Sequence, residues 1–125
     1  MPDSSEELVK GFLAAVENSD WSALDVLVHD DFFMEWPQSG ERFRGRANAI
    51  GAMSAQTTKP SHAGESVVLG SGDVWVMMLP LRYGDDIYHY VGIFKVDDGR
   101  IRSATEFFGA PFPAPEFRAQ FTDRD

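Results

Sequence analysis

The sequence predicts an α+β domain, with helices in the first half of the chain and a run of antiparallel strands in the second. Apolar residues recur at helical spacing before residue 56, whereas from residue 64 onward short strand-like runs are divided by turn residues. A length of 125 residues is enough for one domain with a substantial core. We therefore expect a single domain over residues 1–125, with flexible ends at residues 1–4 and 119–125.

Three helices are predicted in the first half of the chain. Ser4 followed by Glu7 is a capping-box pattern, and it favours a helix over residues 5–17. Asp20 is a suitable N-cap for a short second helix. A third helix is expected over residues 46–56.

Strands account for most of the remaining chain. Pro37 ends the first of them, because proline cannot donate to a strand ladder. A short edge hairpin is expected around residues 42–44. The main strands, separated by turn residues, are expected at residues 32–36, 64–69, 73–83, 86–96 and 100–108. A strongly bent sheet wrapped around the third helix leaves a conical space with an apolar pocket.

The stretch over residues 86–109 is typical of two long strands joined by a tight turn. The loop at residues 97–99 suits a type I turn closed by a left-handed glycine, and it places Tyr90 opposite Glu106. A two-residue turn shifts the register by one and puts His89 on the Glu106 face instead. The three-residue loop predicts one face with Tyr88, Tyr90, Gly92, Phe94, Ala104, Glu106 and Phe108, and another with Ile87, His89, Val91, Ile93, Ile101, Ser103, Thr105 and Phe107.

The C-terminal tail alternates proline with small and aromatic residues over residues 110–115. Such a segment cannot form a regular helix or strand. Its phenylalanines, with Phe117 and Phe121 beyond them, predict that the tail packs back on the body.

Composition restricts the partners. The chain carries 20 acidic and 11 basic side chains, a formal net charge of −9, which argues against nucleic acid or an anionic membrane as partner. It has no cysteine, so disulfides and thiolate chemistry are excluded. We see neither a signal-peptide pattern nor an apolar run of membrane-spanning length, and we expect a cytoplasmic protein.

Two runs of residues resemble a known superfamily. The run FLAAVENSDWSALDVLVHDDFFMEWPQSGERFRGRANAI resembles the opening, and VDDGRIRSATEFFG the close, of the SnoaL-like and ketosteroid isomerase-like branch of the nuclear transport factor 2-like superfamily. The resemblance covers nearly the whole chain. It implies a cone-shaped fold, with three helices against a curved, mostly antiparallel sheet, and a homodimer formed through the convex sheet face. It implies no single reaction, because the same cone hosts several chemistries.

The departures from the ketosteroid isomerase pattern are informative. By the resemblance, the helix-one tyrosine falls on Phe12, the general-base aspartate on Trp36 and the protonated aspartic acid on Gly92. All three reacting groups of that site, a worked case in enzymology, are missing. Steroid isomerisation by that mechanism is therefore not expected. Arg82 and Glu106 are only a partial substitute for the Arg–Asp network of limonene epoxide hydrolases.

Glu106 is the strongest candidate for chemistry. A carboxyl on an apolar face is desolvated, which raises its pKa toward the range of a general acid or base. Tyr90 is the candidate donor to it or to a ligand oxygen, and His89 and Arg82 are weaker catalytic candidates. In the alternative interpretation, Glu106 pairs with Arg82 or Arg102 and only holds the strands together.

The pocket is expected to bind a small hydrophobic molecule. Its predicted lining consists of Phe12, Trp36, Met53, Tyr88, Gly92, Phe94 and Phe108. No histidines and carboxylates have metal-ligand spacing, so no metal and no cofactor are expected.

Two functions of different classes follow. The first is a cofactor-free enzyme of isomerase, cyclase, dehydratase or hydrolase type that acts on a hydrophobic ligand. The second is a non-catalytic ligand-binding or accessory protein. An open cavity of about 300 Å³ or more that touches Glu106 favours a ligand site, whereas a filled cone with Glu106 paired to an arginine argues against one.

Overall fold

The three predicted helices are present in the computed structural model, which describes residues 5–123. They are α1 (Ser5–Glu17), α2 (Trp21–Leu27) and α3 (Arg46–Ala55). Asp20 caps α2 as expected, because its carboxylate accepts a hydrogen bond of 3.2 Å from the backbone N–H of Ala23. The expected cap at Ser4 and the expected flexibility of residues 1–4 lie outside the described residues.

One seven-stranded sheet forms the second layer, with strand order β2-β1-β7-β6-β5-β3 and with β4 also paired to β5. Its strands are β1 (Val28–Trp36), β2 (Glu41–Arg44), β3 (Ser61–His62), β4 (Val67–Ser71), β5 (Val74–Tyr83), β6 (Asp86–Asp97) and β7 (Arg100–Gly109). All pairs are antiparallel except β1 with β7. The expected curved, mostly antiparallel sheet is therefore confirmed, and β3 is an addition that the sequence pattern missed.

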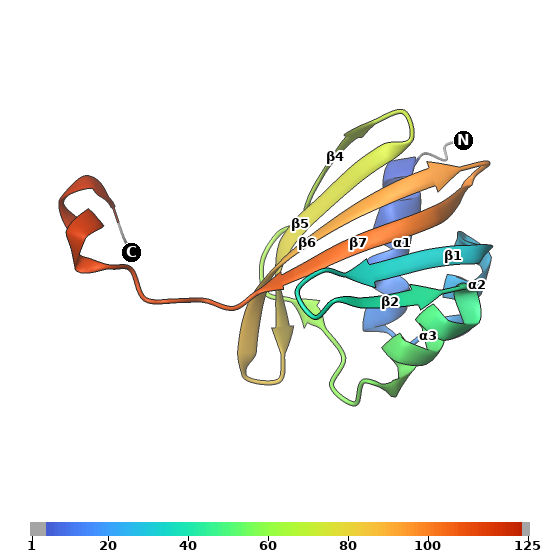
Figure 1. The fold of residues 1–125 in the computed structure, drawn as a ribbon, viewed down its shortest axis with the longest axis horizontal. Helices are drawn as coiled ribbons and strands as arrows, with labels where there is room; N and C mark the ends of the chain where they lie inside the picture. Colours follow the sequence, from blue (N-terminus) through green and yellow to red (C-terminus); the bar gives the residue numbers. More distant parts are fainter. Residues whose placement is uncertain (1–4, 124–125) are drawn as a thin grey trace.

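The helix that crosses the sheet is α1 and not the third helix, so that expectation was wrong (Figure 1). α1 packs against β4, β5 and β7, whereas α3 packs on β1 and β2. The reason is that α1 presents the larger apolar face, with Val9, Phe12 and Leu13 buried against the sheet. The pocket described below is consequently bounded by α1 on one side.

The hairpin of β6 and β7 differs from its predicted register. Its turn contains only Asp98 and Gly99, with φ values of 56° and 76°, as in the mirror-image turns favoured by hairpins. Gly92 lies opposite Glu106, and Tyr90 lies opposite Phe108. Tyr90 is therefore a diagonal neighbour of Glu106, not its direct partner.

A β-bulge at Arg102 restores the predicted face of the glutamate. Two residues of β7 follow Ile101 before Ser103 pairs with Lys95, which leaves Arg102 as the extra residue. The extra residue adds a second shift of one residue in the same direction as that of the two-residue turn. A total shift of two restores the face, so Glu106 and Tyr90 share the inner face and His89 does not. Ile101, predicted on the outer face, is fully buried because it lies before the bulge.

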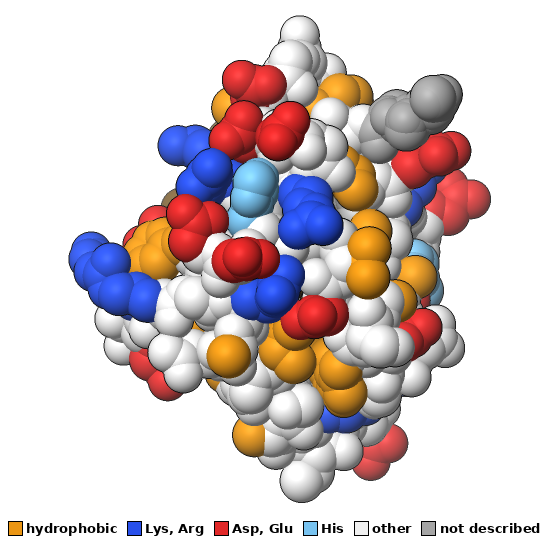
Figure 2. Space-filling view, turned by 90° about the vertical axis from the view of Figure 1, so that its right-hand side faces the viewer, with side chains coloured by type: hydrophobic (Ala, Val, Ile, Leu, Met, Phe, Trp, Pro, Cys, Tyr) orange, Lys and Arg blue, Asp and Glu red, His pale blue; other side chains and the backbone are white. Residues whose placement is uncertain are grey.

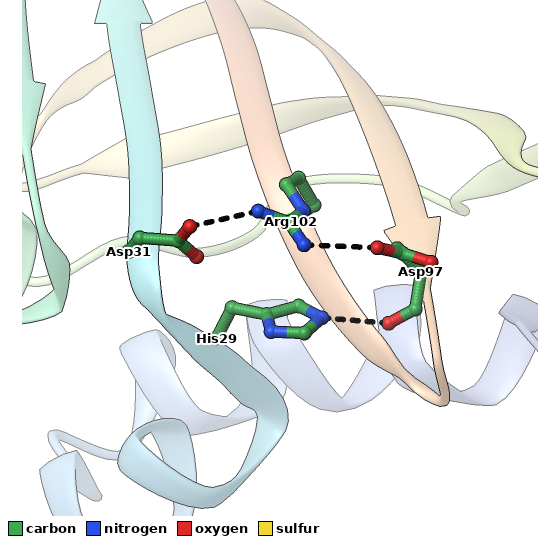
Figure 3. Close-up of polar contacts among 4 residues, drawn as sticks. All are labelled: His29, Asp31, Asp97 and Arg102. Carbon is green, nitrogen blue, oxygen red and sulfur yellow. Dashed lines mark hydrogen bonds and ion pairs between the residues drawn. The ribbon is translucent and has the colours of Figure 1, made fainter.

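The bulged arginine is held by ion pairs (Figure 3). Its guanidinium lies 2.8 Å from the carboxylate of Asp31 on β1 and 2.9 Å from that of Asp97 on β6. His29 adds a hydrogen bond of 2.8 Å to the backbone carbonyl of Asp97. These contacts join the turn end of the hairpin to the start of β1, and Arg102 does not reach Glu106.

Charged side chains of both signs lie next to one another on the face drawn in Figure 2, with hydrophobic side chains between them. That arrangement agrees with the ion pairs that tie Arg102 and Arg46 to neighbouring aspartates. Within residues 5–123, no helix is long and apolar enough to cross a membrane.

The C-terminal tail leaves the end of β7 and extends away from the body (Figure 1). Phe112, Phe117 and Phe121 are exposed by 79%, 73% and 79%, so the expectation that they pack back on the body was wrong. Three alternating prolines restrict residues 110–115 to extended conformations, and this stiffness keeps the tail from turning back. A short 3-10 helix (Glu116–Phe121) follows the prolines.

Candidate functional site

Glu106 is the one charged side chain buried in the core of the described residues, with 5% of its surface exposed. Each carboxylate oxygen accepts one hydrogen bond. The indole Nε1–H of Trp36 donates to Oε1 at 2.8 Å, and the hydroxyl of Tyr90 donates to Oε2 at 2.5 Å. No arginine pairs with it in the described part of the chain, so the arrangement differs from the scaffolding alternative.

Burial decides the protonation chemistry of this cluster. It raises the pKa of the Glu106 carboxyl above the ordinary value of 4.5, while the hydrogen bonds from Tyr90 and Trp36 oppose the rise. Burial and the nearby charge of Glu106 raise the pKa of Tyr90 well above its ordinary value. Tyr90 thus stays a neutral donor, and Glu106 is shifted toward the range in which a carboxyl exchanges protons near neutral pH.

Gly92 makes room for the tyrosine. A Cβ atom at Gly92 would lie 2.4 Å from the Tyr90 hydroxyl oxygen and 2.7 Å from a ring carbon of Phe94. The Tyr90 side chain therefore crosses over Gly92 to reach Glu106 on the neighbouring strand. Gly92 determines the site through this close approach, and it lies beneath the ring instead of lining the cavity.

A small cavity of about 40 Å³ opens beside Glu106. It is bounded by α1, by β-strand residues and by the segment after α3; its lining residues are Phe12, Leu13, Val16, Trp36, Met53, Gln56, Thr58, Lys59, Pro60, Leu81, Tyr83, Tyr90, Glu106 and Phe108. A space of this size holds a water molecule or the end of a ligand.

A second, wider space of about 340 Å³ shares five lining residues with the first. We call it the mouth; it is lined by Trp36, Gln56, Thr58, Tyr83, Asp86, Tyr88 and Phe108. The cavity criterion is thus met only in part, because the space that exceeds 300 Å³ does not touch Glu106. The two spaces adjoin each other along these five shared residues.

The structure brings together most of the predicted site residues. Phe12, Trp36, Met53, Tyr90 and Phe108 line the inner cavity with Glu106, and Tyr88 lines the mouth. Phe94 instead belongs to the core, where its ring packs 5.2 Å from that of Phe12.

Two of the weaker candidates lie elsewhere. His89 and Arg82 are exposed on the outer face of the sheet, opposite to Glu106, so the structure does not place them in the site. Strand alternation explains this, since both neighbours of Tyr90 and of Leu81 point away from the core.

Tyr83 is the site residue that sequence reasoning missed. It lines both the inner cavity and the mouth, and burial together with the charge of Glu106 raises its pKa. The signal was available in the strand, because Leu79 and Leu81 point inward and a period of two puts Tyr83 on the same face. The loop residues Gln56 and Thr58 carried no such signal.

The described residues contain no group of three or more His, Cys, Asp or Glu side chains placed to hold a metal ion. The only cation beside the inner cavity in that part of the chain is Lys59. Its ammonium donates to the carbonyl oxygens of Met53 and Gln56 and lies 5.1 Å from the ring of Trp21. Lys59 therefore closes the end of α3 and is not free to neutralise Glu106.

Comparison with known proteins supports the fold and the family. The model of the SnoaL-like domain family matches residues 9–104, and the match ends two residues before Glu106. An NTF2-like protein of unknown function from Burkholderia xenovorans LB400 is 30% identical, with a TM-score of 0.81 over 95% of this chain and 93% of that one.

Two more distant structures share the fold. A provisionally assigned ketosteroid isomerase from Kribbella flavida DSM 17836 is 21% identical, with a TM-score of 0.86 over 96% of this chain and 88% of that one. An LEH-like epoxide hydrolase from M. tuberculosis is 24% identical, with a TM-score of 0.68 over 86% and 85%. No curated protein matches. The expected cone-shaped, nuclear transport factor 2-like fold is confirmed by these likenesses.

Proposed function

Because the chain belongs to the SnoaL-like domain family, we propose that it is a small-molecule enzyme that uses Glu106 as a general acid or base. One observation carries this proposal. A buried carboxyl with a raised pKa, hydrogen-bonded to a tyrosine, lines a cavity that adjoins the wider mouth. Desolvating a carboxyl without a salt-bridge partner costs free energy. The same desolvation raises the pKa of the carboxyl, which suits a general acid or base.

The hydrogen bonds of Glu106 determine which of its carboxylate oxygens accepts a proton from a ligand. An indole N–H can only donate, so Oε1 of Glu106 stays an acceptor while Trp36 holds it. A proton taken from a ligand goes to Oε2, which then donates to the oxygen of Tyr90. The Tyr90 hydroxyl is thereby released to donate to a ligand oxygen. Glu106 and Tyr90 act as a pair that moves one proton and stabilises one developing negative charge.

The proposed substrate class follows from the residues that line the inner cavity. The lining is mainly apolar and aromatic, which suits a hydrophobic molecule such as a cyclic carbonyl or polyketide-like compound. The reaction is of isomerase, cyclase, dehydratase or hydrolase type, needs no cofactor, and differs from that of ketosteroid isomerase, because Phe12, Trp36 and Gly92 cannot supply its groups. Structures of the same fold carry isomerase and epoxide hydrolase names.

A thermal-shift screen tests the proposal. Wild type and Glu106→Gln are heated with hydrophobic ketones, lactones, epoxides and polyketide fragments, and ligands that stabilise the wild type enter turnover assays. Ligand that binds only the folded state raises the melting temperature by mass action. We expect turnover by the wild type and at least a hundredfold loss in Glu106→Gln, the usual worth of a general acid or base.

Glu35→Gln is the matched control. Glu35 lies on β1 beside Thr105, one residue from Glu106, but its side chain is on the outer face. Its substitution changes the same charge without touching the cavity, so turnover should remain. Equal losses in both variants, or a folded Glu106→Gln protein with full turnover, contradict the proposed role of Glu106.

The small size of the inner cavity favours a second function, that of a non-catalytic ligand-binding or accessory protein. About 40 Å³ beside Glu106 admits only the end of a ligand, and both carboxylate oxygens already have donors. A ligand that stabilises wild type and Glu106→Gln alike, with no turnover of any stabilising compound, supports this alternative.

We also propose a homodimer formed through the outer face of the sheet. Val67 and Leu69 on β4 are exposed by 45% and 58%, and Val74 and Met78 on β5 by 45% and 38%. Paired residues share a face of the sheet, so these side chains form one apolar surface on the side opposite to the pocket. A second copy of the chain covers this outer surface and leaves the mouth open.

A further inference from the structure

Four aromatic rings line the mouth, and each ring packs nearly perpendicular to the next. Trp36 meets Phe108 at 87° with centroids 5.9 Å apart, and Phe108 meets Tyr83 at 72° and 6.4 Å. Tyr83 meets Tyr88 at 76° and 5.8 Å. The four rings therefore pack edge to face in a continuous chain, and all four line the mouth.

The charge of the mouth has one sign. Asp86 is the only acidic side chain among its lining residues, whereas the inner cavity beyond the shared residues is lined by both Glu106 and Lys59. None of the lining residues is a lysine or arginine. The faces of aromatic rings carry partial negative charge, so rings and carboxylate favour the same kind of ligand.

We propose that the mouth binds an alkylated ammonium group, tertiary or quaternary, of the ligand. Such a group is large and apolar at its surface, carries a full positive charge and needs few hydrogen bonds. A space lined by four aromatic side chains and one carboxylate meets these requirements. A purely hydrophobic ligand would explain the rings but gives no use for Asp86.

This inference deepens the proposed function and rests on it only in one respect, that the mouth leads to the reacting groups. An ammonium group held by the rings places the rest of its molecule toward the inner cavity. Glu106, whose side chain is 5% exposed, lines that cavity. The ligand class becomes a cationic, otherwise apolar compound. Binding of the ammonium group itself is measured without any turnover.

Choline and its uncharged carbon isostere dimethylbutanol are the probes. They have the same shape, so titration calorimetry of the full chain with each measures the contribution of the charge. We expect choline to bind about tenfold more tightly than the isostere. Equal affinities, or no binding of choline by folded wild type, overturn the inference.

Three variants locate the binding. Tyr88→Leu keeps an apolar side chain but removes one wall, and we expect choline to bind at least fivefold more weakly. Asp86→Asn should weaken it about threefold, while Asp85→Asn, the adjacent exposed aspartate that does not line the mouth, should not. Melting curves confirm that each variant is folded. Equal losses in the two aspartate variants indicate only the net charge of the protein and overturn the inference.

The two proposals fail separately. A wild type that turns over neutral carbonyl compounds but does not distinguish choline from its isostere retains the proposed function and overturns the inference. A wild type that prefers choline, with full turnover by a folded Glu106→Gln protein, retains the ammonium site and contradicts the catalytic role of Glu106.

Discussion

Trp36 and Gly92 occupy two positions at which the ketosteroid isomerase pattern carries its aspartates, and both instead serve a glutamate on the strand between them. β7 lies between β1 and β6 in the sheet. From β1, Trp36 donates to Glu106, and from β6, Gly92 pairs with Glu106 and leaves room for Tyr90. The carboxyl of the pocket thus comes from β7, between the two strands that carry Trp36 and Gly92.

The raised pKa of Glu106 has a measurable consequence for stability. Between pH 4.5, the ordinary pKa, and the higher pKa in the folded protein, the folded state binds more protons than the unfolded chain. The contribution of Glu106 is therefore fully present below pH 4.5 and is lost as pH rises through the folded pKa. We expect the stability of wild type relative to Glu106→Gln, measured by urea unfolding, to fall with rising pH. A relative stability that rises with pH would indicate a lowered pKa instead.

Gly92→Ala tests how the tyrosine is positioned. The new methyl group cannot occupy a point 2.4 Å from the Tyr90 hydroxyl oxygen, so the ring must move and its hydrogen bond to Glu106 must lengthen or break. We expect a loss of about 1–3 kcal/mol in the free energy of unfolding. Gly51→Ala on the exposed side of α3 meets no atom within 4 Å and should be neutral or slightly stabilising. Equal effects of the two variants would contradict the steric argument.

At the scale of elements, the β6–β7 hairpin decides which side chains meet in the site. Its two-residue turn and the bulge at Arg102 each shift the strand by one residue in the same direction, and the total shift of two residues leaves each side chain on its predicted face beyond the bulge. The sequence-based register therefore had the wrong partners but the correct face for Tyr90 and Glu106. Arg102 at the bulge also contacts Asp31 and Asp97, and these ion pairs join distant segments.

Removal of the bulged residue and removal of its side chain should differ strongly. Arg102→Ala deletes solvent-exposed ion pairs, which contribute little because water screens them, so we expect a mild loss of stability. Deletion of Arg102 turns Glu106 to the outer face and moves outer residues of β7 into the core, so we expect the protein not to fold. Circular dichroism and urea unfolding distinguish the outcomes. A folded deletion variant with a buried Glu106 would show that the bulge can move elsewhere in β7.

At the scale of the whole molecule, the proposed dimer depends on the exposed apolar side chains of β4 and β5. Leu69→Glu places a charge on that surface and should convert a dimer to monomers, since burying an unpaired charge is costly. Val26→Glu changes a residue of α2 that is 66% exposed and not on the sheet, and it should not. Light scattering gives the mass of each. A monomeric wild type, or dissociation in both variants, contradicts an interface on this face.

Local periodicity, capping and turn residues were enough to predict the helices, the main strands other than β3, and the inward face of Glu106. The donor from Trp36 and the position of the mouth could be seen only in the tertiary structure. Each of these depends on side chains from strands far apart in the sequence, and a glutamate 70 residues from its tryptophan partner leaves no local pattern. The direction of the tail likewise became clear only in the structure. The prolines keep the tail extended, so its phenylalanines stay exposed instead of packing on the body.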